Sequence, residues 1–388
     1  MTPRLVHVTT TDMSLALLLG PQLRAFAEAG YEVIGVSAPG PFVAELEAQG
    51  IRHIPLRHAT RSAAPHRDVL ALAELRALFS DLRPAIVHTH NPKPGVYGRL
   101  AARAAGVPAI VNTVHGLYAL PDDRWAKRAL VYGLELLASR CSQAELVQNP
   151  EDVETLLRLG MPRSKVHLLG NGIDLTRFDP GRAVAQRRKI RAEWGVTAEE
   201  VVIGAVGRLV AEKGYPELFE AVASIAEQHP QVRLVVIGPA EADKSDALDG
   251  GVIREAEAAG VRFLGYRDDV EVLYPAMDLY VLASHREGFP RSAMEAAAMG
   301  LPVVATDVRG CRQVVDEGIT GRLVVVNDAR ALGAAIAELV ADPSLRVAMG
   351  RAGREKALRE FDQQQVIDFT LSTYERLLPT RLERTAAA

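Results

Sequence analysis

The sequence predicts an α/β fold made of two doubly wound domains that face each other across a cleft. Three observations support this fold class. The chain has 388 residues, which is more than one ordinary α/β core needs. Short β-branched runs alternate with segments of helical period almost throughout. This alternation stops once, at residues 172–181, where one domain would end.

The alternating segments predict strands and helices in regular succession. The expected strands are residues 5–9, 32–37, 51–55, 85–90, 109–113, 145–148 and 165–169 in the first half, and 201–206, 233–237, 261–264, 279–283, 303–306 and 321–325 in the second. The expected helices, which end at Gly or Pro, are 22–30, 70–82, 94–106, 217–229, 293–300 and 331–339. A repeated strand–helix–strand order indicates parallel sheets that are buried on both faces.

The break in this pattern places the domain boundary. We expect an N-terminal domain at 1–178 and a C-terminal domain at 179–361, with a last helix at 362–380 that packs back on the first domain. Ligands of such folds bind at the carboxyl ends of the strands, so the site is expected in the cleft. Because the chain crosses between the domains twice, we also expect hinges near 172–181 and 361, at which the domains close on a ligand.

Composition narrows the class of protein. The formal net charge of −3 gives no overall basic field, so no nucleic-acid partner is expected. Only Cys141 and Cys311 are present, which is too few for a disulfide framework or a zinc site and favours the cytoplasm. The N-terminal apolar stretch is interrupted by polar residues at 9–12 and is better interpreted as a first strand than as a signal peptide. No run of about 18 apolar residues predicts a transmembrane span.

A glycine-rich loop with two cations opens the second domain. The expected strand at 201–206 is followed by Gly207 and Arg208, and Lys213 comes five residues later. Glycine at a strand end lets the backbone approach a ligand, and the two cations suit a diphosphate. An exposed loop with ordinary surface cations is the equally plain alternative. The segment is neither a dinucleotide fingerprint nor a Walker loop.

A second segment, residues 284–300, follows the apolar strand at 279–283. Glu287 precedes a Gly-Phe-Pro turn, and Glu295 lies about one turn inside the helix that follows, for which Ser292 is a candidate N-cap. The N-terminus of this helix would provide a seat for a phosphate. Two acids on either side of such a turn are placed to bind hydroxyls on either side of a diphosphate. The alternative is a helix with two surface glutamates.

The segment from Glu287 to Glu295 resembles the E-x7-E motif of glycosyltransferase family 4. Four further stretches match landmarks of that family in order: Asn-Gly-Ile-Asp at 171–174, the loop at 207–214, Phe-Leu-Gly-Tyr at 263–266 and Gly-Ile-Thr-Gly at 318–321. The resemblance covers nearly the whole chain. It implies a GT-B fold of two Rossmann-like domains, and sugar transfer that needs no metal, uses no cofactor beyond the nucleotide-sugar co-substrate and retains the anomeric configuration.

The resemblance also implies roles for individual residues. Arg208 and Lys213 would hold the diphosphate and stabilise the leaving group, Glu287 would bind hydroxyls of the donor sugar, and Glu295 would bind the ribose. The donor-binding set is then Gly207, Arg208, Lys213, Arg267, Glu287, Gly288, Phe289, Pro290, Arg291, Ser292 and Glu295, with Arg267 near the base. Cations in the site would take the place of a metal, because charge develops on the departing phosphate.

The first domain is expected to supply the acceptor side. His115 follows the buried strand at 109–113, where similar proteins place a histidine near the donor sugar; it is expected to be catalytic, or else a histidine satisfied by the backbone. We interpret His88 and His90 as facing opposite sides of one strand, with His90 and Lys93 turned toward the site and His88 in the core. No carboxylate accompanies the two histidines, so no metal is expected.

The loop after the first strand departs from the family pattern. Many members carry Gly-Gly where this chain has Thr-Thr-Asp-Met at 10–13. Asp12 is expected either to bind a hydroxyl of the acceptor or to cap a helix that starts near residue 14. Because this loop lacks glycine, the close backbone contacts to a ligand that the family pattern implies are not expected to carry over unchanged.

Two segments suggest contact with a membrane. Residues 52–67 are basic, contain histidines and have no carboxylate. Residues 117–140 mix Tyr118, Trp125 and leucines with basic residues. Either segment is compatible with an anionic lipid surface or a lipid-diphosphate acceptor, and equally with an ordinary solvated surface. The stretch from 88 to 115 resembles bacterial family members that build surface polysaccharides on lipid carriers.

The predicted function is retaining transfer of a hexose or N-acetylhexosamine from a nucleotide-diphosphate sugar to a hydroxyl acceptor. UDP is the expected carrier, with GDP second, and the acceptor is a saccharide, a lipid-linked saccharide or a small molecule. Enzymes of the same fold that epimerise or phosphorolyse sugars are one alternative, and a nucleotide-sugar-binding protein without turnover is another. The expected location is the cytoplasm, with possible contact at the inner face of the membrane.

Overall fold

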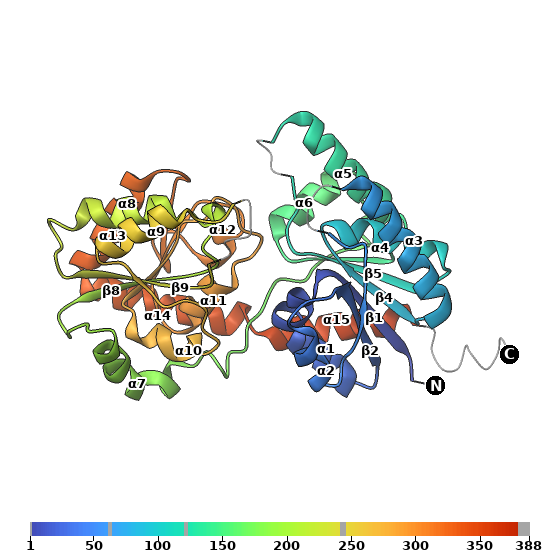
Figure 1. Ribbon diagram of the computed structural model, residues 1–388, viewed down its shortest axis with the longest axis horizontal. Helices are drawn as coiled ribbons and strands as arrows, with labels where there is room; N and C mark the ends of the chain where they lie inside the picture. Colours follow the sequence, from blue (N-terminus) through green and yellow to red (C-terminus); the bar gives the residue numbers. More distant parts are fainter. Residues whose placement is uncertain (1, 61–63, 120–122, 241–245, 379–388) are drawn as a thin grey trace. The chain divides into compact units, whose positions relative to one another are not determined.

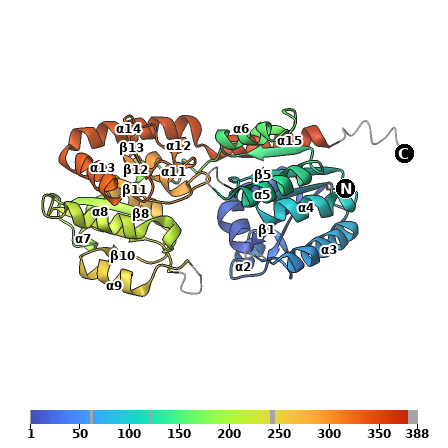
Figure 2. The same cartoon turned by 90° about the horizontal axis from the view of Figure 1, so that it is seen from above.

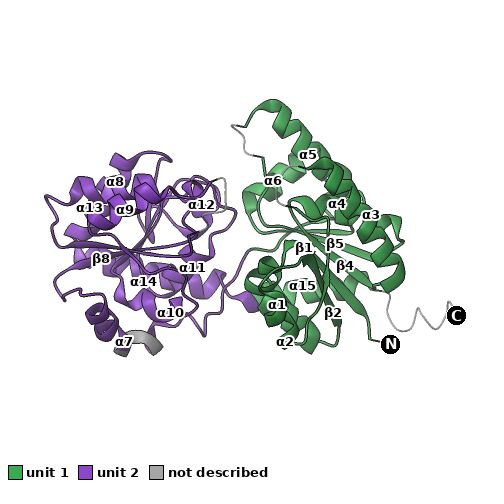
Figure 3. Cartoon of the chain, in the orientation of Figure 1, with its two compact units in different colours: residues 1–170, 365–388 green, residues 171–364 purple. Residues whose placement is uncertain are grey.

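A computed structural model describes residues 2–60, 64–119, 123–240 and 246–378 of the chain. It divides into two compact units, residues 1–170 with 365–388 and residues 171–364 (Figure 3). Each unit is an α/β body with its own parallel sheet, and each is described by itself below.

The first unit contains a seven-stranded parallel sheet in the order β3-β2-β1-β4-β5-β6-β7. Its strands are β1 (Arg4–Thr11), β2 (Glu32–Ala38), β3 (Arg52–Pro55), β4 (Ile86–His90), β5 (Ala109–Val114), β6 (Ala144–Val147) and β7 (Val166–Leu168). Its helices are η1 (Ser14–Leu18), α1 (Gly20–Glu28), α2 (Val43–Ala48), α3 (Pro65–Leu82), α4 (Lys93–Ala104), α5 (Trp125–Ser139), α6 (Pro150–Arg158) and α15 (Gln363–Leu377).

Both faces of this sheet are buried, as the sequence pattern predicts. Leu5 of β1 packs in one core with residues of α1 and α15, whereas Val6 packs in the opposite core with residues of α3 and α4. Successive side chains of a strand point to opposite faces, so a continuous apolar run fills both cores. Figure 1 shows helices on both sides of the sheet.

The second unit contains a six-stranded parallel sheet in the order β10-β9-β8-β11-β12-β13. Its strands are β8 (Val201–Val206), β9 (Val232–Ile237), β10 (Arg262–Phe263), β11 (Leu279–Leu282), β12 (Val303–Thr306) and β13 (Gly321–Val324). Its helices are α7 (Pro180–Glu193), η2 (Ala211–Lys213), α8 (Tyr215–Ile225), α9 (Gly250–Ala258), α10 (Val270–Leu273), η3 (Tyr274–Ala276), α11 (Arg291–Ala298), α12 (Cys311–Val314), α13 (Ala329–Ala341) and α14 (Pro343–Glu360).

Helices again cover both faces of the sheet (Figures 1 and 2), and a hydrophobic core lies on each face. Residues of α8 and α13 pack on one face, and residues of α7, α11 and α14 pack on the other. The predicted fold class is therefore confirmed, because each half of the chain is a doubly wound parallel α/β body.

The division between the units falls at 170/171, earlier than the expected 178/179. The backbone explains the difference. Ile173 donates to the carbonyl of Phe361 at 2.9 Å and accepts from Gln363 at 3.1 Å, and Phe178 packs in a core of the second unit. Residues 171–178 thus belong to the second unit. Within α15, Ile367 and Tyr374 pack in a core of the first unit.

Every strand that the sequence predicts is present. Seven of the described α-helices were not expected, namely α2, α5, α6, α9, α10, α12 and α14. Helix α14 shows why. Its buried residues are Met349, Gly350, Gly353, Lys356 and Ala357, most of them small or polar, so it lacks a periodic apolar stripe. Among the described residues, no helix is long and apolar enough to cross a bilayer.

Candidate active site

Two loops of the second unit come together where neighbouring strands end. One follows β8 and contains Arg208 and Lys213, and the other follows β11 and contains Glu287. Because β8 and β11 are parallel neighbours, their carboxyl ends lie at the same edge of the sheet. Lys213 and Glu287, which are 74 positions apart in sequence, form an ion pair with Nζ and Oε1 2.5 Å apart.

The second loop is fastened to the first at three further points. The backbone N–H of His285 donates to the carbonyl of Glu212 at 2.9 Å. The imidazole of His285 pairs with Glu217 at the start of α8 at 2.9 Å, and Arg286 pairs with Glu212 at 3.3 Å. These contacts fix the two loops as one structure.

Gly214 lets the first loop lie against the end of β11. It has a φ of +67°, and a Cβ atom there would be 2.0 Å from the carbonyl oxygen of Ala283. Only glycine fits a left-handed residue in such close backbone contact. The close approach brings Lys213 onto Gly207 and toward Glu287.

Glu287 has two described partners on the same oxygen. Ser284 donates its hydroxyl to Oε1 at 2.7 Å, and Lys213 approaches the same atom. The side chain of Glu287 is 11% exposed and that of Lys213 is 23% exposed, so the pair is largely shielded from solvent. A carboxylate and an ammonium held in this way are suited to a ligand that carries both hydroxyls and phosphate.

Glu295 lies on α11, and a buried tyrosine braces it. The hydroxyl of Tyr274 approaches Oε2 of Glu295 at 3.0 Å and the carbonyl of Ser292 at 3.1 Å. Burial raises the pKa of Glu295, while Arg291, the hydroxyl of Tyr274 and Arg177 act in the opposite direction. The carboxyl is thus held in a partly desolvated position at the first turns of the helix.

Ser292 is not the N-cap of α11. The helix begins at Arg291 with Pro290 in the N-cap position, so Ser292 lies inside the first turn. Its hydroxyl accepts a hydrogen bond from Tyr280 of β11 at 2.7 Å. The expected N-cap was wrong because the proline, with its fixed backbone angle, takes the position at which the chain enters the helix.

The other residues predicted to bind the sugar donor lie either near the Lys213–Glu287 pair or away from it. Gly288 and Phe289 form the turn before Pro290, and Phe289 accepts a hydrogen bond from the side chain of Asn171 at 3.2 Å. Arg267 lies in an exposed loop, where it makes a two-pronged ion pair with Asp269 at 2.7 and 2.6 Å. Its present partner is therefore an acid on its own loop.

In the first unit, His115 follows β5 and is held from two sides. Its backbone N–H donates to the side-chain oxygen of Asn91 at 2.8 Å, and the amide of Asn91 donates to the carbonyl of Gly116 at 2.6 Å. Its Nε2 lies 2.9 Å from Nδ1 of His90. Burial lowers the pKa of His115 to about 4, which the amide of Gln148 partly opposes.

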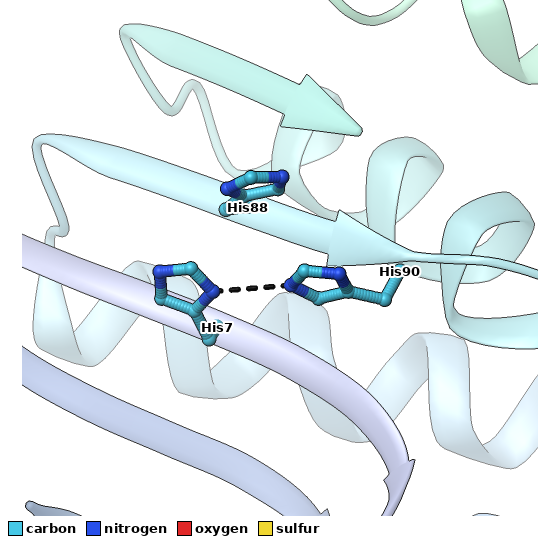
Figure 4. Close-up of side chains that lie close together, drawn as sticks. All are labelled: His7, His88 and His90. Carbon is cyan, nitrogen blue, oxygen red and sulfur yellow. Dashed lines mark hydrogen bonds between the residues drawn. The ribbon is translucent and has the colours of Figure 1, made fainter. Parts of the chain in front are cut away.

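His88 and His90 do not face opposite sides of β4, as we interpreted them from sequence. Their rings stack with centroids 4.6 Å apart, and both are buried. The interpretation was wrong because strand side chains alternate with a period of two, so residues two apart share a face. His7 of the neighbouring β1 joins them on that face (Figure 4).

The three histidines form the only group of potential metal ligands found among the described residues, with ligand atoms within 4.8 Å of one another. However, His88 and His90 lie in nearly parallel planes, at 18°. Lone pairs lie in the ring plane, so stacked rings do not direct them at one point. Each ring nitrogen of the three also has a hydrogen-bond partner. This geometry favours hydrogen bonding between neutral imidazoles over metal ligation.

Asp12 and Lys93 are both engaged in contacts within the first unit. Asp12 is buried and accepts a hydrogen bond from the backbone N–H of Phe42 at 2.8 Å, at the start of α2. It therefore does not cap η1, whose N-cap makes no side-chain hydrogen bond. Lys93 pairs with Asp68 of α3 at 2.6 Å and donates to the carbonyl of Thr60 at 3.2 Å.

Sequence analysis missed the residues that brace the site. These are Ser284, Tyr274, Tyr280, His7 and Tyr374. A usable signal existed for His7 and Tyr280, because each is a hydrogen-bonding residue in an otherwise apolar strand. Tyr274 and Tyr374 contact residues that are far away in sequence, whereas Ser284 contacts Glu287 only three positions away.

Comparison with known proteins gives the class of this chain. The model of "Glycosyltransferase Family 4" matches residues 22–177, and that of "Glycosyl transferases group 1" matches residues 186–356. A UDP-Gal:alpha-D-GlcNAc-diphosphoundecaprenol alpha-1,3-galactosyltransferase of Escherichia coli is 30% identical over 306 residues, 78% of each chain. The capsular polysaccharide biosynthesis glycosyltransferase CapM of Staphylococcus aureus is 28% identical and covers 97% of each chain.

Solved structures agree on the fold. HepE of Anabaena, in complex with UDP and glucose, has a TM-score of 0.79 at 20% identity and covers 96% of this chain and 99% of its own. Sucrose-phosphate synthase of Thermosynechococcus elongatus has a TM-score of 0.80 at 23% identity, with 97% and 99% covered. The fold is GT-B, the two-domain class of glycosyltransferases. The chain belongs to glycosyltransferase family 4, and it is a glycosyltransferase that uses nucleotide sugars.

Proposed function

We propose that the protein transfers a hexose or N-acetylhexosamine from a UDP sugar to a hydroxyl of a lipid-linked saccharide, with retention of configuration and without a metal. The observation that carries the proposal is the shielded pair of Lys213 and Glu287 at adjoining strand ends. One cation and one carboxylate within contact distance match a donor whose phosphate and sugar hydroxyls are neighbours.

Each group of the site has a task in this reaction. Lys213 and Arg208 stabilise the charge that develops on the departing diphosphate. Glu287 binds hydroxyls of the donor sugar, and Glu295 binds those of the ribose. His115 donates a hydrogen bond to the sugar. No step requires a metal ion, because the cations of the chain supply the electrostatic stabilisation.

The relatives support the nucleotide and the acceptor. The Escherichia coli relative is named for a UDP sugar and a diphosphoundecaprenol acceptor, and CapM is named for capsular polysaccharide biosynthesis. A second relative with a diphospho-undecaprenol acceptor in its name, from Campylobacter jejuni, is 23% identical and covers 92% of this chain. These names favour a transferase over an epimerase and over a binding protein without turnover.

The experiment is a panel of UDP and GDP sugars, each incubated with and without a diphosphoundecaprenol-linked sugar. We expect one UDP sugar to raise the melting temperature by binding the folded state. The same sugar should release UDP only when the acceptor is present. Epimerised donor without transfer, or binding without any turnover with every acceptor tested, would contradict the proposal.

We also propose that helix α5 rests on the anionic leaflet that faces the nucleotide-sugar pool. Leu130, Leu134 and Leu137 lie at helical spacing on one side of α5 and are 64%, 40% and 49% exposed. Trp125 at the start of the helix is 81% exposed. A shallow groove of about 470 Å³ runs beside it, lined by Trp125, Arg128, Tyr132 and Leu136 among others.

The charges of α5 suit such a surface. Its acid, Glu135, is buried in an ion pair with Arg99 at 2.6 Å, so its charge is directed into the unit. Arg124, Lys127 and Arg128 remain on the exposed part of the segment. Basic residues beside exposed Trp and Leu are the pattern of a helix that lies in a membrane interface.

Flotation with vesicles of phosphatidylglycerol and phosphatidylcholine tests this second proposal. We expect Leu130→Ser and Trp125→Ala to lower the bound fraction, while Leu358→Ser, a change at a residue of α14 that is 51% exposed, leaves it unchanged. Equal binding by all variants, or binding that does not depend on phosphatidylglycerol, would contradict the assignment.

A further inference from the structure

A chain of hydrogen bonds runs through the first unit from His115 to α15. Nε2 of His115 lies 2.9 Å from Nδ1 of His90, and Nε2 of His90 lies 3.1 Å from Nδ1 of His7 (Figure 4). Nε2 of His7 lies 3.4 Å from the hydroxyl of Tyr374. The chain thus connects the loop after β5 with β4, β1 and the last helix.

The chain of hydrogen bonds continues beyond Tyr374 and ends at a group that can either donate or accept a hydrogen bond. The hydroxyl of Tyr374 lies 2.5 Å from Nδ1 of His88, whose Nε2 lies 2.7 Å from the hydroxyl of Thr113. A threonine hydroxyl donates or accepts equally well, so it closes the chain in both cases. At the other end, Nδ1 of His115 is buried and receives no hydrogen bond of normal geometry.

The number of protons in the chain is fixed because its imidazoles are neutral. Burial lowers the pKa of His7 to about 3 and that of His115 to about 4, and it holds the pKa values of His88 and His90 well below their usual range. A neutral imidazole has one N–H donor and one acceptor nitrogen. The direction of one hydrogen bond therefore sets the direction of all the others when the hydroxyl of Tyr374 accepts from one histidine and donates to the other.

Two arrangements satisfy every link and also give the hydroxyl proton of Tyr374 an acceptor. In one, His115 donates from Nε2 into the chain and its Nδ1 carries a lone pair. In the other, Thr113 donates to His88, His88 to Tyr374, Tyr374 to His7, His7 to His90, and His90 to Nε2 of His115, so the proton of His115 is on Nδ1. Only the second arrangement leaves His115 with an N–H group outside the chain. Because this nitrogen is buried in the structure, donor binding has to uncover it before a sugar hydroxyl or ring oxygen accepts from it.

We propose that His7, His90 and Tyr374 are positioning residues, which hold His115 as the neutral tautomer with its proton on Nδ1. The inference rests on the proposed function, in which His115 donates to the donor sugar. The three residues act through His115 and do not touch the sugar. They also explain why a buried, aliphatic sheet holds stacked histidines, since replacing any one of them leaves its neighbours without partners.

NMR of the full-length protein labelled with ¹⁵N-histidine tests the tautomer directly. Long-range proton–nitrogen correlations identify which ring nitrogen carries the proton, and the spectrum of His115→Gln assigns the signals. At pH 7.5 we expect one tautomer of His115, protonated on Nδ1. In Tyr374→Phe the link between His88 and His7 is broken, and the tautomer protonated on Nε2 should become detectable.

Tyr31→Phe is the matched control, because Tyr31 packs against the ring of Tyr374, at a centroid distance of 5.9 Å, without joining the chain. It should leave the His115 signals unchanged. Should Tyr374→Phe not fold, His90→Gln interrupts the chain one link from His115 and should show the same mixture. A wild-type His115 protonated on Nε2, or variants that keep the wild-type tautomer, would overturn the proposal.

Transfer kinetics separate a positioning role from a structural one. Tyr374→Phe and His90→Gln should lower kcat about tenfold or more with little change in KM for the donor, as expected when a reacting contact is misaligned. Tyr31→Phe should retain the wild-type kcat. If His115→Gln transferred sugar at the wild-type rate while the tautomer data held, the role of His115 in the proposed function would fall, and the hydrogen-bonded chain itself would stand.

Discussion

Lys213 and Glu287 neutralise each other's charge in the structure. Their contact is 2.5 Å long, and Ser284 completes the coordination of the same carboxylate oxygen. A bound phosphate would draw the ammonium of Lys213 away and leave Glu287 to accept from sugar hydroxyls. In the proposed function, the pair keeps both side chains in place until the donor separates them.

Lys213→Ala should lower kcat by about 10²-fold or more, the loss expected when one preorganised electrostatic stabiliser is removed. Lys189→Ala is the control, because Lys189 lies on α7 with its side chain 79% exposed. Steady-state rates of UDP release measure both. A Lys213→Ala enzyme within a few-fold of the wild type would show that the cation does not stabilise the leaving group.

Glu295→Gln should stabilise the protein at pH 7 while it weakens donor binding. Burial raises the pKa of Glu295 above its unfolded value, so the folded protein binds the proton more tightly than the unfolded chain does. The free energy of unfolding therefore falls as the pH rises from the unfolded pKa through the folded one, and ionised Glu295 costs stability at neutral pH. The amide removes that cost, and its benefit should vanish below the unfolded pKa.

Urea denaturation at several pH values checks this prediction. Glu338→Gln is the control of opposite sign, because an ion pair with Arg322 lowers the pKa of Glu338. In that variant the free energy of unfolding should not rise at pH 7. A Glu295→Gln protein that is less stable than the wild type at pH 7 would contradict the desolvation argument.

At the residue scale, the sequence predicted the types of side chain in the donor loops but not their partners. Glu287, Lys213 and Arg208 belong to local motifs, so their spacing identifies them. Tyr274 contacts Glu295 through tertiary packing, and Ser284 contacts Glu287 within the same loop. His88 and His90 were placed on opposite faces because the strand period was miscounted. The acceptor-side roles of Asp12 and Lys93 stay predictions, and both residues are occupied by other partners in the structure.

The turn between β8 and α8 sets the conformation of the loop that contains Arg208 and Lys213. Its conformation depends on Gly214, the left-handed N-cap of α8 that lies against the carbonyl of Ala283. The same principle holds for Gly310, where a Cβ atom would be 2.6 Å from the carbonyl oxygen of Glu287. Such close backbone contacts bring together the loops that follow β8, β11 and β12.

Gly214→Ala should lower the free energy of unfolding by more than about 1 kcal/mol, because the new Cβ clashes with a backbone carbonyl and the residue keeps a positive φ. Sugar transfer should fall as well, since Lys213 moves with the turn. Gly250→Ala at the start of α9 is the control. Its Cβ would meet only the flexible end of Arg254 at 3.4 Å. Thermal denaturation of both variants measures the difference.

Elements with a strong apolar period could be predicted from the sequence, and others could not. All the strands follow from β-branched runs, whereas α14 packs through glycines and α5 exposes much of its apolar surface. Neither helix has the one-sided pattern on which prediction depends. The exposed leucines of α5, Leu130, Leu134 and Leu137, would be buried only if another surface covered the helix.

At the scale of the whole molecule, two α/β units are joined by chain that crosses between them twice, at 170/171 and 364/365. The sequence predicted the two-unit organisation because each unit repeats the strand–helix pattern. It misplaced the first crossing because residues 171–178 have no regular pattern and are recruited to the second unit by the backbone pairing of Ile173.

The central claim is metal-independent transfer with retention of configuration, and proton NMR of the product tests it most directly. The preferred UDP sugar and a diphosphoundecaprenol-linked acceptor are incubated with EDTA, and the anomeric coupling constant of the new linkage is compared with that of the donor. We predict the same anomeric configuration and an unchanged rate in EDTA. An inverted anomer, or activity that disappears in EDTA and returns with Mg²⁺ or Mn²⁺, would contradict the account.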